Sequence, residues 1–304
     1  MSGNDVKKYT DIVRMGHRET VGVVKEGDYI TVYEKLDGAN ASFTAGAEVL
    51  AFSRNTQLSA ENNLRGFYEF TRKIDPQALV PNAIYYGEWL VKHKVDYGDK
   101  AGVFYLFDIY DKVTETYAPT HVVVQEAARL GLAIAPILYA GPYVSFEHLQ
   151  AFVGRSAYAT KADCGEGIVV KNVNFRDRFG KQTFIKLVSE GFREIQPQKA
   201  PRDPNAPISA EAAFVQTFMT EGRVDKLLRK LVDEALIPEE FGLEDMGAIL
   251  RELGGRVYED MLKEERESLP EEFEERDIRK SIGKKLPLIV RSIITESSNL
   301  KEAA

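Results

Sequence analysis

The sequence predicts an α+β protein of two domains, and three observations lead to this fold class. Short segments with a hydrophobic period of two, typical of half-buried strands, recur as far as about residue 190. Residues 196–208 hold four prolines and few large apolar side chains, as in an extended linker. Beyond them the period changes to about 3.6, the period of helices. We therefore expect a domain at 1–195 built on antiparallel sheets with flanking helices, and a small all-α domain at 209–304.

Composition narrows the classes of protein that this chain can be. Its 304 residues are 44% hydrophobic and 29% charged, which suits one large or two ordinary globular domains. No apolar run is long enough to cross a bilayer, so we expect no membrane partner. Cys164 is the single cysteine, which excludes an internal disulfide and a cysteine-based zinc cluster and favours the reducing cytoplasm. The four histidines show no metal-ligand spacing, so we expect them to be structural or exposed.

The net charge of −7 argues at first against a nucleic-acid partner, but its distribution weakens that argument. Residues 1–200 carry 24 basic and 24 acidic side chains, whereas residues 201–304 carry 16 and 23. The acidic excess therefore belongs to the helical domain. Local basic clusters can bind phosphates within a neutral domain, so the total charge does not decide the partner.

The first alternating segment, residues 29–33, leads into residues 34–40 (EKLDGAN), where the chemistry of the chain is most readable. Lys35 continues one face of this strand, and a lysine at a strand end is a candidate covalent nucleophile. Burial or neighbouring cations must lower its pKa, because only the neutral amine reacts. Gly38 allows the backbone to approach a phosphate or sugar closely. Taken alone, Lys-x-Asp-Gly fits a strand that ends in a surface turn at least as well.

The other elements of the first domain follow from alternation, helical spacing and turn residues. The turn at 45–48 joins two strands in a hairpin, and Pro76 and Gly131 end two of the helices. Strands are expected at 41–44, 49–55, 83–90, 103–110, 135–139, 166–171 and 183–188, and helices at 60–74, 121–131 and 145–153.

Charged side chains stand at the ends of these strands. Glu88 and Asp108 each place one carboxylate among apolar residues, which is costly unless that carboxylate is hydrogen-bonded or paired. The last two strands carry Glu166, Lys171 and Lys186. In the helical domain four apolar stripes follow one another, at about 214–231, 246–253, 258–262 and 282–293.

Five segments resemble, in order and spacing, the motifs of the covalent nucleotidyltransferases, the superfamily of DNA ligases, RNA ligases and mRNA-capping enzymes. They are EKLDG, YGEW, FYLFDIY, EGIVVK and TFIKLV. DNA ligases and capping enzymes continue with a strand-rich barrel, whereas this chain continues with helices. Residues 186–194 and 219–224 are also similar to the RNA ligase 2 family. The chain thus resembles an ATP-dependent RNA ligase of that family, with an N-terminal nucleotidyltransferase domain.

The resemblance implies a three-step reaction that uses ATP and Mg²⁺ or Mn²⁺. Lys35 attacks the α-phosphorus of ATP, AMP then passes from the lysine to an RNA 5′-phosphate, and a 3′-hydroxyl finally expels AMP. The implied substrate is RNA with 3′-hydroxyl and 5′-phosphate ends, taken here as nicks in duplex RNA, and we expect a monomer. Positioning and charge neutralisation dominate such transfers, which agrees with the lysines and carboxylates available.

The resemblance also implies a role for each motif residue. Lys35, Glu166, Lys171 and Lys186 would be catalytic, with Glu166 near the metal and the two later lysines on the phosphates. Residues around the nucleotide would be Glu34 at the adenosine, Asn40 and Arg54 near the phosphates and the nucleic-acid end, Glu88 at the ribose and Phe107 on the adenine. Without the family pattern, Arg54 fits a surface arginine and Phe107 fits a core aromatic.

Val188 departs from the family pattern, which has two lysines two positions apart in its last motif. Positions 186 and 188 share one strand face, so one cation is missing from the expected phosphate pocket. We expect Lys171, or a basic residue of the turn at 176–181, to compensate.

Three other functions remain open. The same chemistry would serve sealing of DNA nicks or guanylyl transfer in capping, and an inactive relative would only bind a nucleotide or RNA. In the tail, Arg223, Lys226, Arg229, Lys230, Lys280, Lys284 and Lys285 could line a face toward RNA, or could be solvated surface.

Overall fold

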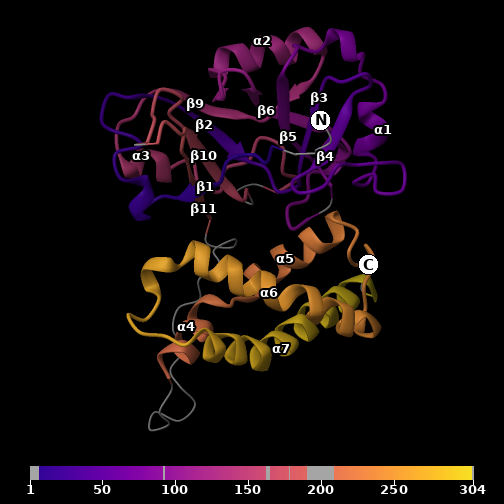
Figure 1. Cartoon of the computed structure of the whole chain (residues 1–304), viewed down its shortest axis with the longest axis vertical. Helices are drawn as coiled ribbons and strands as arrows, with labels where there is room; N and C mark the ends of the chain where they lie inside the picture. Colours follow the sequence, from indigo (N-terminus) through magenta and orange to yellow (C-terminus); the bar gives the residue numbers. More distant parts are fainter. Residues whose placement is uncertain (1–6, 92, 162–164, 178, 190–208, 303–304) are drawn as a thin grey trace. The chain divides into compact units, whose positions relative to one another are not determined.

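A computed structural model describes residues 7–91, 93–161, 165–177, 179–189 and 209–302. The chain divides into two compact units, Met1–Ser189 and Glu190–Ala304 (Figure 1). The first unit contains two mostly antiparallel sheets with flanking helices, and the described part of the second is helical, so the predicted fold class is confirmed. The expected linker at 196–208 lies outside the described residues, as do residues 190–194 of the segment that resembles RNA ligase 2.

The first sheet has the strand order β1-β11-β10-β2-β9. Its strands are β1 (Ile12–Arg14), β11 (Phe184–Val188), β10 (Gly167–Lys171), β2 (Tyr29–Lys35) and β9 (Ile137–Pro142). β1 runs parallel to β11, and the other pairs are antiparallel. Alternation along β2 sends Ile30 and Val32 into a core with β10, β11 and the helix α3 (Phe146–Gln150), so Lys35 belongs to the opposite face.

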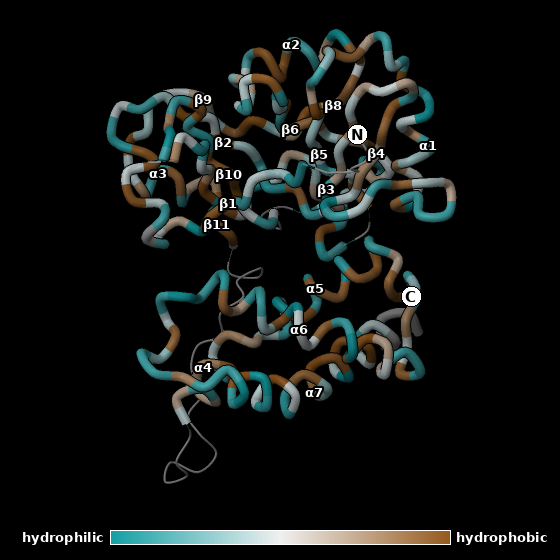
Figure 2. Tube along the Cα trace, viewed as in Figure 1, coloured by the Kyte–Doolittle hydropathy of each residue, from teal (hydrophilic) through white to brown (hydrophobic). Residues whose placement is uncertain are grey.

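The second sheet has the order β4-β3-β5-β6-β7, with β8 parallel to β6. Its strands are β4 (Leu50–Ser53), β3 (Ala39–Thr44), β5 (Ala83–Trp89), β6 (Phe104–Asp111), β7 (Thr116–Tyr117) and β8 (Ala133–Ile134). Helices α1 (Phe67–Thr71) and α2 (Thr120–Leu130) add apolar side chains to its core. Brown, hydrophobic stretches coincide with β6, β10 and β11 in Figure 2.

The two sheets are joined by a short connection, residues 36–38, between β2 and β3. Because β2 belongs to one sheet and β3 to the other, the Asp-Gly turn lies at their junction. Side chains that follow the turn on β3, β5 and β6 can therefore lie near the lysine that precedes it.

Three of the expected elements have different bounds in the structure. The helix expected at 60–74 is only α1, because Leu64, Arg65 and Gly66 have positive φ angles of 50°, 51° and 95°, which a right-handed helix excludes. The strand expected at 135–139 begins only at Ile137, as part of β9, and follows Pro136, which has no backbone N–H to donate. The helix expected at 145–153 is the shorter α3.

The second unit consists of four α-helices within its described residues. They are α4 (Ala210–Phe218), α5 (Glu221–Asp233), α6 (Met246–Glu264) and α7 (Glu275–Glu302), and they surround one apolar core. The stripes expected at 246–253 and 258–262 are parts of the single helix α6, because Gly254 and Gly255 between them do not interrupt it. Short 3-10 helices occur in the first unit at η1 (Arg18–Thr20), η2 (Pro76–Ala78) and η3 (Gly98–Lys100), and in the second unit at η5 (Leu243–Asp245) and η6 (Arg266–Ser268). Among the described helices, none combines the length and apolar character needed to span a membrane.

Candidate active site

Lys35, at the end of β2, meets Glu166, the residue that precedes β10. The sheet register pairs Lys35 with Gly167, so the start of β10 lies directly beside the lysine. Lys35 Nζ donates a hydrogen bond of 2.5 Å to Glu166 Oε2, and the two side chains are 24% and 10% exposed. A carboxylate held against an amine can accept its proton, so such a pair is chemically able to supply a nucleophile and its base. The structure thus brings together the two residues expected at the centre of the site.

Glu34 points to the opposite face of β2 and is buried. Its carboxylate accepts hydrogen bonds from the Ser156 hydroxyl and, at 2.8 Å, from the Ala157 backbone N–H. Burial raises the pKa of Glu34, and these two hydrogen bonds oppose the rise because they favour the ionised form. Glu34 therefore holds residues 156–157 against β2, and its expected contact with adenosine stays a prediction.

Asp37, in the turn after β2, is anchored by the segment that follows β5. Its Oδ2 accepts hydrogen bonds of 2.8 and 2.9 Å from the backbone N–H groups of Lys94 and Val95, and His93 Nδ1 lies 3.5 Å from Oδ1. Burial by itself would raise the pKa of Asp37, but His93 and the Val95 N–H outweigh it, so this pKa lies below its ordinary value. Asp37 thus serves to fix the turn beside the lysine.

Gly38 brings the turn against β5 and Glu88. A Cβ at this position would lie only 2.7 Å from the Trp89 carbonyl oxygen, which explains the glycine. The Gly38 N–H donates a hydrogen bond of 3.0 Å to Glu88 Oε1, and Glu88 is the register partner of Asn40 on β3. Burial raises the pKa of Glu88 to about 8, and the charge of Glu166 adds to the rise. Glu88 and Asn40 therefore lie beside the turn that joins the two sheets, and their expected contacts with a nucleotide stay predictions.

Phe107 lies at a β-bulge in β6. Tyr86 pairs with Asp108 and Gly87 pairs with Leu106, so Phe107 between them has no partner on β5. Bulges commonly re-aim a side chain near functional sites, and they leave backbone groups outside the regular ladder. The backbone carbonyl of half-buried Phe107 therefore lies outside the regular β5–β6 pairing and accepts a hydrogen bond from the side chain of another residue instead.

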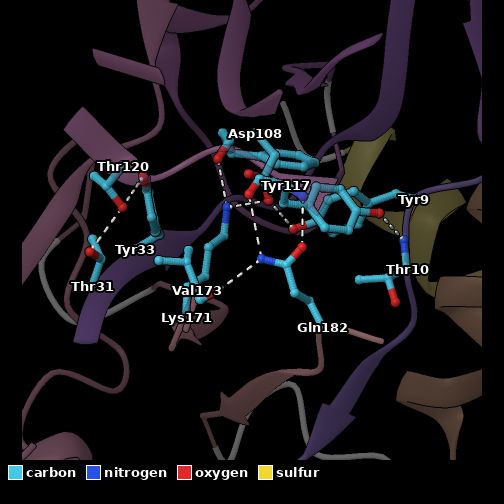
Figure 3. A network of polar contacts seen from close by, with 11 residues as sticks. Tyr9, Thr10, Thr31, Tyr33, Asp108, Tyr117, Thr120, Lys171, Val173 and Gln182 are labelled. Atoms are coloured by element: carbon cyan, nitrogen blue, oxygen red, sulfur yellow. Dashed lines mark hydrogen bonds and ion pairs between the residues drawn. The ribbon is translucent and has the colours of Figure 1, made fainter. Parts of the chain in front are cut away.

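Lys171 is that residue, and it lies in a buried network (Figure 3). Its ammonium group donates hydrogen bonds of 2.6 Å to the Phe107 carbonyl and 2.7 Å to Asp108 Oδ2, and it lies 4.4 Å from the centre of the Tyr33 ring. The Tyr9 hydroxyl donates a further hydrogen bond of 2.6 Å to the same Asp108 oxygen. Burial raises the pKa of Asp108 and lowers that of Lys171, while their mutual attraction opposes both shifts. The expected phosphate contact of Lys171 stays a prediction, and in this structure its ammonium is engaged by β6.

The same network ties the two sheets together at further points. Gln182 accepts a hydrogen bond of 2.6 Å from the Tyr117 N–H and donates one of 3.0 Å to the Val173 carbonyl. Thr120, at the start of α2, donates a hydrogen bond of 2.9 Å to Thr31 on β2. These contacts fix the separation between the sheet that carries the lysine and the sheet that carries Phe107.

Lys186 lies on the same face of the first sheet as Lys35. Along β10, Gly167 pairs with Lys35 on one side and Val188 on the other, whereas Val169 pairs with Lys186. Arg14 on β1 is the register partner of Lys186 from the opposite side. A second cation therefore flanks Lys186 on the same face of the sheet, two residues along from Val188, where the family pattern has its second lysine.

The remaining residues expected at the site lie farther along the chain. Arg54 follows β4, and its guanidinium makes an ion pair of 2.9 Å with Asp11 in which both side chains are exposed. Arg176, in the turn expected to compensate for Val188, donates hydrogen bonds to the carbonyls of Val173 and Phe175. Arg178 of that turn lies outside the described residues.

Sequence reasoning missed Arg14, His93 and Ser156. Arg14 belongs to a strand of three residues whose place depends on parallel pairing with β11, and residues 7–25 show no alternation that would reveal it. His93 and Ser156 lie in irregular segments, where periodicity gives no signal. Asp108 and Lys171 were both noted from the sequence, but the ion pair between them was not predicted.

No curated protein sequence matches the chain significantly. Solved structures that are similar include a Naegleria gruberi RNA ligase with PPi, at 22% identity and a TM-score of 0.44, which covers 63% of this chain and 58% of that chain. A mutant of that ligase with ATP and Mn gives 21% identity and a TM-score of 0.42 over 60% of this chain and 56% of that chain. The chain thus spans little more than half the length of these proteins. The model of the RNA ligase family matches residues 28–188, which is more than half of the chain. The chain belongs to the RNA ligase family.

Proposed function

We propose that the chain is an ATP-dependent RNA ligase that joins 3′-hydroxyl and 5′-phosphate ends, with nicks in duplex RNA as its substrate. The observation that carries the proposal is the 2.5 Å hydrogen bond from Lys35 Nζ to Glu166 Oε2 in a member of the RNA ligase family. An amine held by a carboxylate, on a sheet face with further cations, suits attack on a phosphate.

In the first step Lys35 Nζ gives a proton to Glu166 Oε2, and its lone pair forms a bond to the α-phosphorus of ATP. The bond from this phosphorus to the bridging oxygen breaks, and pyrophosphate leaves with the electron pair. The remaining excess proton on the nitrogen passes to water. AMP is then bound to Lys35 through a phosphoramidate.

Negative charge grows on the leaving pyrophosphate during this step, and fixed cations stabilise it. Lys186 and its register partner Arg14 are the two cations of the lysine-bearing face that we assign to this task. Arg14 then takes the part of the second lysine, whose position is occupied by Val188. Lys171 supports the site by positioning β6, because its ammonium group donates hydrogen bonds to the Phe107 carbonyl and to Asp108.

The nucleoside half of ATP is assigned to the second sheet. With a pKa of about 8, Glu88 keeps its proton at neutral pH, so it can donate to one ribose hydroxyl oxygen and accept from the other hydroxyl. The ring of Phe107 offers a stacking surface for adenine. Asn40, beside Glu88, and Arg54 are assigned to the phosphates and the nucleic-acid end.

A divalent ion fits this donor set. Within the described residues, no group of three or more His, Cys, Asp or Glu side chains could hold a metal by itself. Mg²⁺ typically uses one or two carboxylates together with substrate phosphates, and Glu166 offers such a carboxylate beside the nucleophile. When bound, Mg²⁺ or Mn²⁺ would neutralise phosphate charge.

In the second step an oxygen of the RNA 5′-phosphate attacks the phosphorus of the lysine-bound AMP, the nitrogen–phosphorus bond breaks, and Lys35 leaves as an amine that takes back the proton from Glu166. In the third step the 3′-hydroxyl oxygen attacks the adenylated 5′-phosphate and gives its proton to water, and AMP leaves with the electron pair of the broken phosphorus–oxygen bond. We assign these reactions to a monomer in the cytoplasm, since a chain with one cysteine suits a reducing compartment.

The test combines the full chain, labelled ATP, a divalent metal and matched nicked duplexes of RNA and DNA. The expected result is a labelled protein and sealed RNA, with neither product from Lys35→Ala. Lys100→Ala, which changes an exposed lysine of the same unit, serves as the control and should match the unchanged protein. Faster sealing of DNA, labelling by GTP in place of ATP, or nucleotide binding without labelling would each overturn the proposal in favour of a different activity.

A further inference from the structure

The last helix, α7, carries four cations at helical spacing. Arg276, Lys280, Lys284 and Arg291, here called the α7 stripe, are four, four and seven residues apart, which places them on neighbouring positions of one helix face. All four side chains are exposed. Within the part of the chain that the structure describes, none of them has a hydrogen bond or ion pair through its side chain.

Other basic residues of the same unit are committed to contacts. Arg223 is completely buried and pairs with Asp260 at 3.0 Å and Glu265 at 2.7 Å, so it cannot line an RNA-binding surface as the sequence had suggested. Arg229, Arg256 and Arg279 have carboxylate partners at 2.7 to 3.0 Å, and Lys285 donates to the Gln216 carbonyl. Of the tail cations noted from the sequence, Lys280 and Lys284 are the ones that stay exposed without a described partner.

The stripe also contrasts with the charge of its surroundings. Residues 201–304 carry 23 acidic and 16 basic side chains, so a group of four exposed cations on one helix face runs against the net charge of this unit. At about 1.5 Å per residue, the first three cations are about 6 Å apart along the helix axis, and Arg291 follows Lys284 after about 10 Å. A polynucleotide strand offers a row of regularly spaced phosphates, and lysine and arginine side chains bind these without reading the bases.

We propose that the α7 stripe binds the phosphate backbone of the RNA duplex. The choice of RNA as the nucleic acid rests on the proposed function. The second unit would then bind the substrate through its phosphates, without reading the base sequence. A membrane surface fits less well, because an interfacial helix needs an apolar face that can enter the lipid. The apolar face of α7, which includes Ile278, Ile282, Leu286 and Val290, is buried in the core of its own unit.

The experiment compares two charge-reversed forms of the full chain. Lys280→Glu/Lys284→Glu changes the stripe, and Arg251→Glu/Arg266→Glu makes the same change in net charge at exposed positions on α6 and η6. Binding to a nicked RNA duplex is measured by fluorescence anisotropy at several salt concentrations, and enzyme–AMP formation is measured separately without RNA. The stripe variant should bind about tenfold more weakly, and its log K against log salt slope should be shallower by about two. The control variant should stay close to the unchanged protein, and all three should form enzyme–AMP at the same rate.

Each outcome bears on one proposal. Equal RNA binding by the stripe variant and the unchanged protein, or equal weakening in both variants, would overturn the role of the stripe. Binding of the unchanged protein to vesicles with anionic lipid that the stripe variant alone loses, while RNA binding is unaltered, would also overturn it. Absence of enzyme–AMP from the unchanged protein would contradict the proposed function and leave the binding result to be judged by itself. If circular dichroism shows that the stripe variant is unfolded, Lys280→Gln/Lys284→Gln replaces it, with a smaller weakening expected.

Discussion

Glu88 is the residue of the site whose charge should respond to pH near neutrality. Its pKa is about 8 in the folded chain, whereas a glutamate in an unfolded chain has a pKa of about 4.3. Between these values the folded state binds more protons than the unfolded state, so the free energy of unfolding falls as pH rises. The contribution of Glu88 is fully present below about pH 4 and is lost as pH passes through 8.

Glu88→Gln should remove this pH dependence, since glutamine does not titrate. We expect the variant to gain stability relative to the unchanged protein steadily from about pH 5 to pH 8, as measured by urea unfolding. Glu147→Gln, at an exposed position on α3, is the control and should show no such trend. A constant difference between the Glu88 variant and the unchanged protein across this pH range would contradict the raised pKa.

Single residues were predictable where a short motif carries the chemistry. Lys35 and Glu166 were both predicted because their segments, EKLDG and EGIVVK, resemble nucleotidyltransferase motifs in order and spacing, whereas Lys-x-Asp-Gly alone fits a surface turn at least as well. Lys171 shows the limit of this reasoning. The resemblance implies a phosphate contact for Lys171, which stays a prediction. Its hydrogen bonds to the Phe107 carbonyl and to Asp108 depend on the bulge in β6, which cannot be read from spacing.

At the scale of elements, the Lys171–Asp108 pair fastens β10 to β6. Lys171→Met would leave Asp108 buried without its cation, and losing one partner of a buried pair typically costs about 3–5 kcal/mol of stability. Lys171→Met/Asp108→Asn should recover part of that loss, because no charge then stays buried. Urea unfolding of both variants checks this, and a double variant no more stable than the single one would show that charge pairing is not the cause.

The pairing of β1 with β11 allows a test of whether Arg14 on β1 replaces the lysine that is absent at Val188 on β11. Arg14→Ala should slow enzyme–AMP formation by about tenfold or more, because it removes a cation from the face that carries Lys35 and Lys186. Val188→Lys adds a lysine on the same face and should restore part of the rate in that background. Single-turnover labelling with ATP measures both effects. An unimpaired Arg14→Ala protein, or a double variant as slow as the single one, would remove Arg14 from the phosphate site.

Elements were predictable to the extent that periodicity is local. Most strands of both sheets lie where alternation predicts them, since their cross-strand neighbours share the same buried face. The sequence did not predict β1, because this strand depends on a parallel partner far along the chain. It also did not predict how short α1 is, because three successive positive φ angles precede that helix. The sequence prediction divided α6 into two apolar stripes at its pair of glycines. Glycine lowers helix propensity, but here it does not end the helix.

At the scale of the whole molecule, each unit has its own apolar core. Deleting residues 209–304 should therefore leave a folded first unit that still forms enzyme–AMP, because every residue assigned to that step precedes residue 189. Transfer of AMP to an RNA 5′-phosphate should be severely reduced without the α7 stripe. Side-by-side assays of enzyme–AMP and sealed RNA measure the two effects. Equal sealing by both proteins, or loss of enzyme–AMP from a folded truncated protein, would contradict this division of labour.

The most direct test of the central claim is to find the atom that carries AMP. The protein is incubated with ATP and a divalent metal, and the adduct is located by mass spectrometry of its peptides. We predict AMP on Lys35 through a phosphoramidate that is labile in acid and stable in alkali, with a yield that falls strongly in Glu166→Gln. AMP on any other residue, or an unchanged yield from Lys35→Ala, would contradict the account.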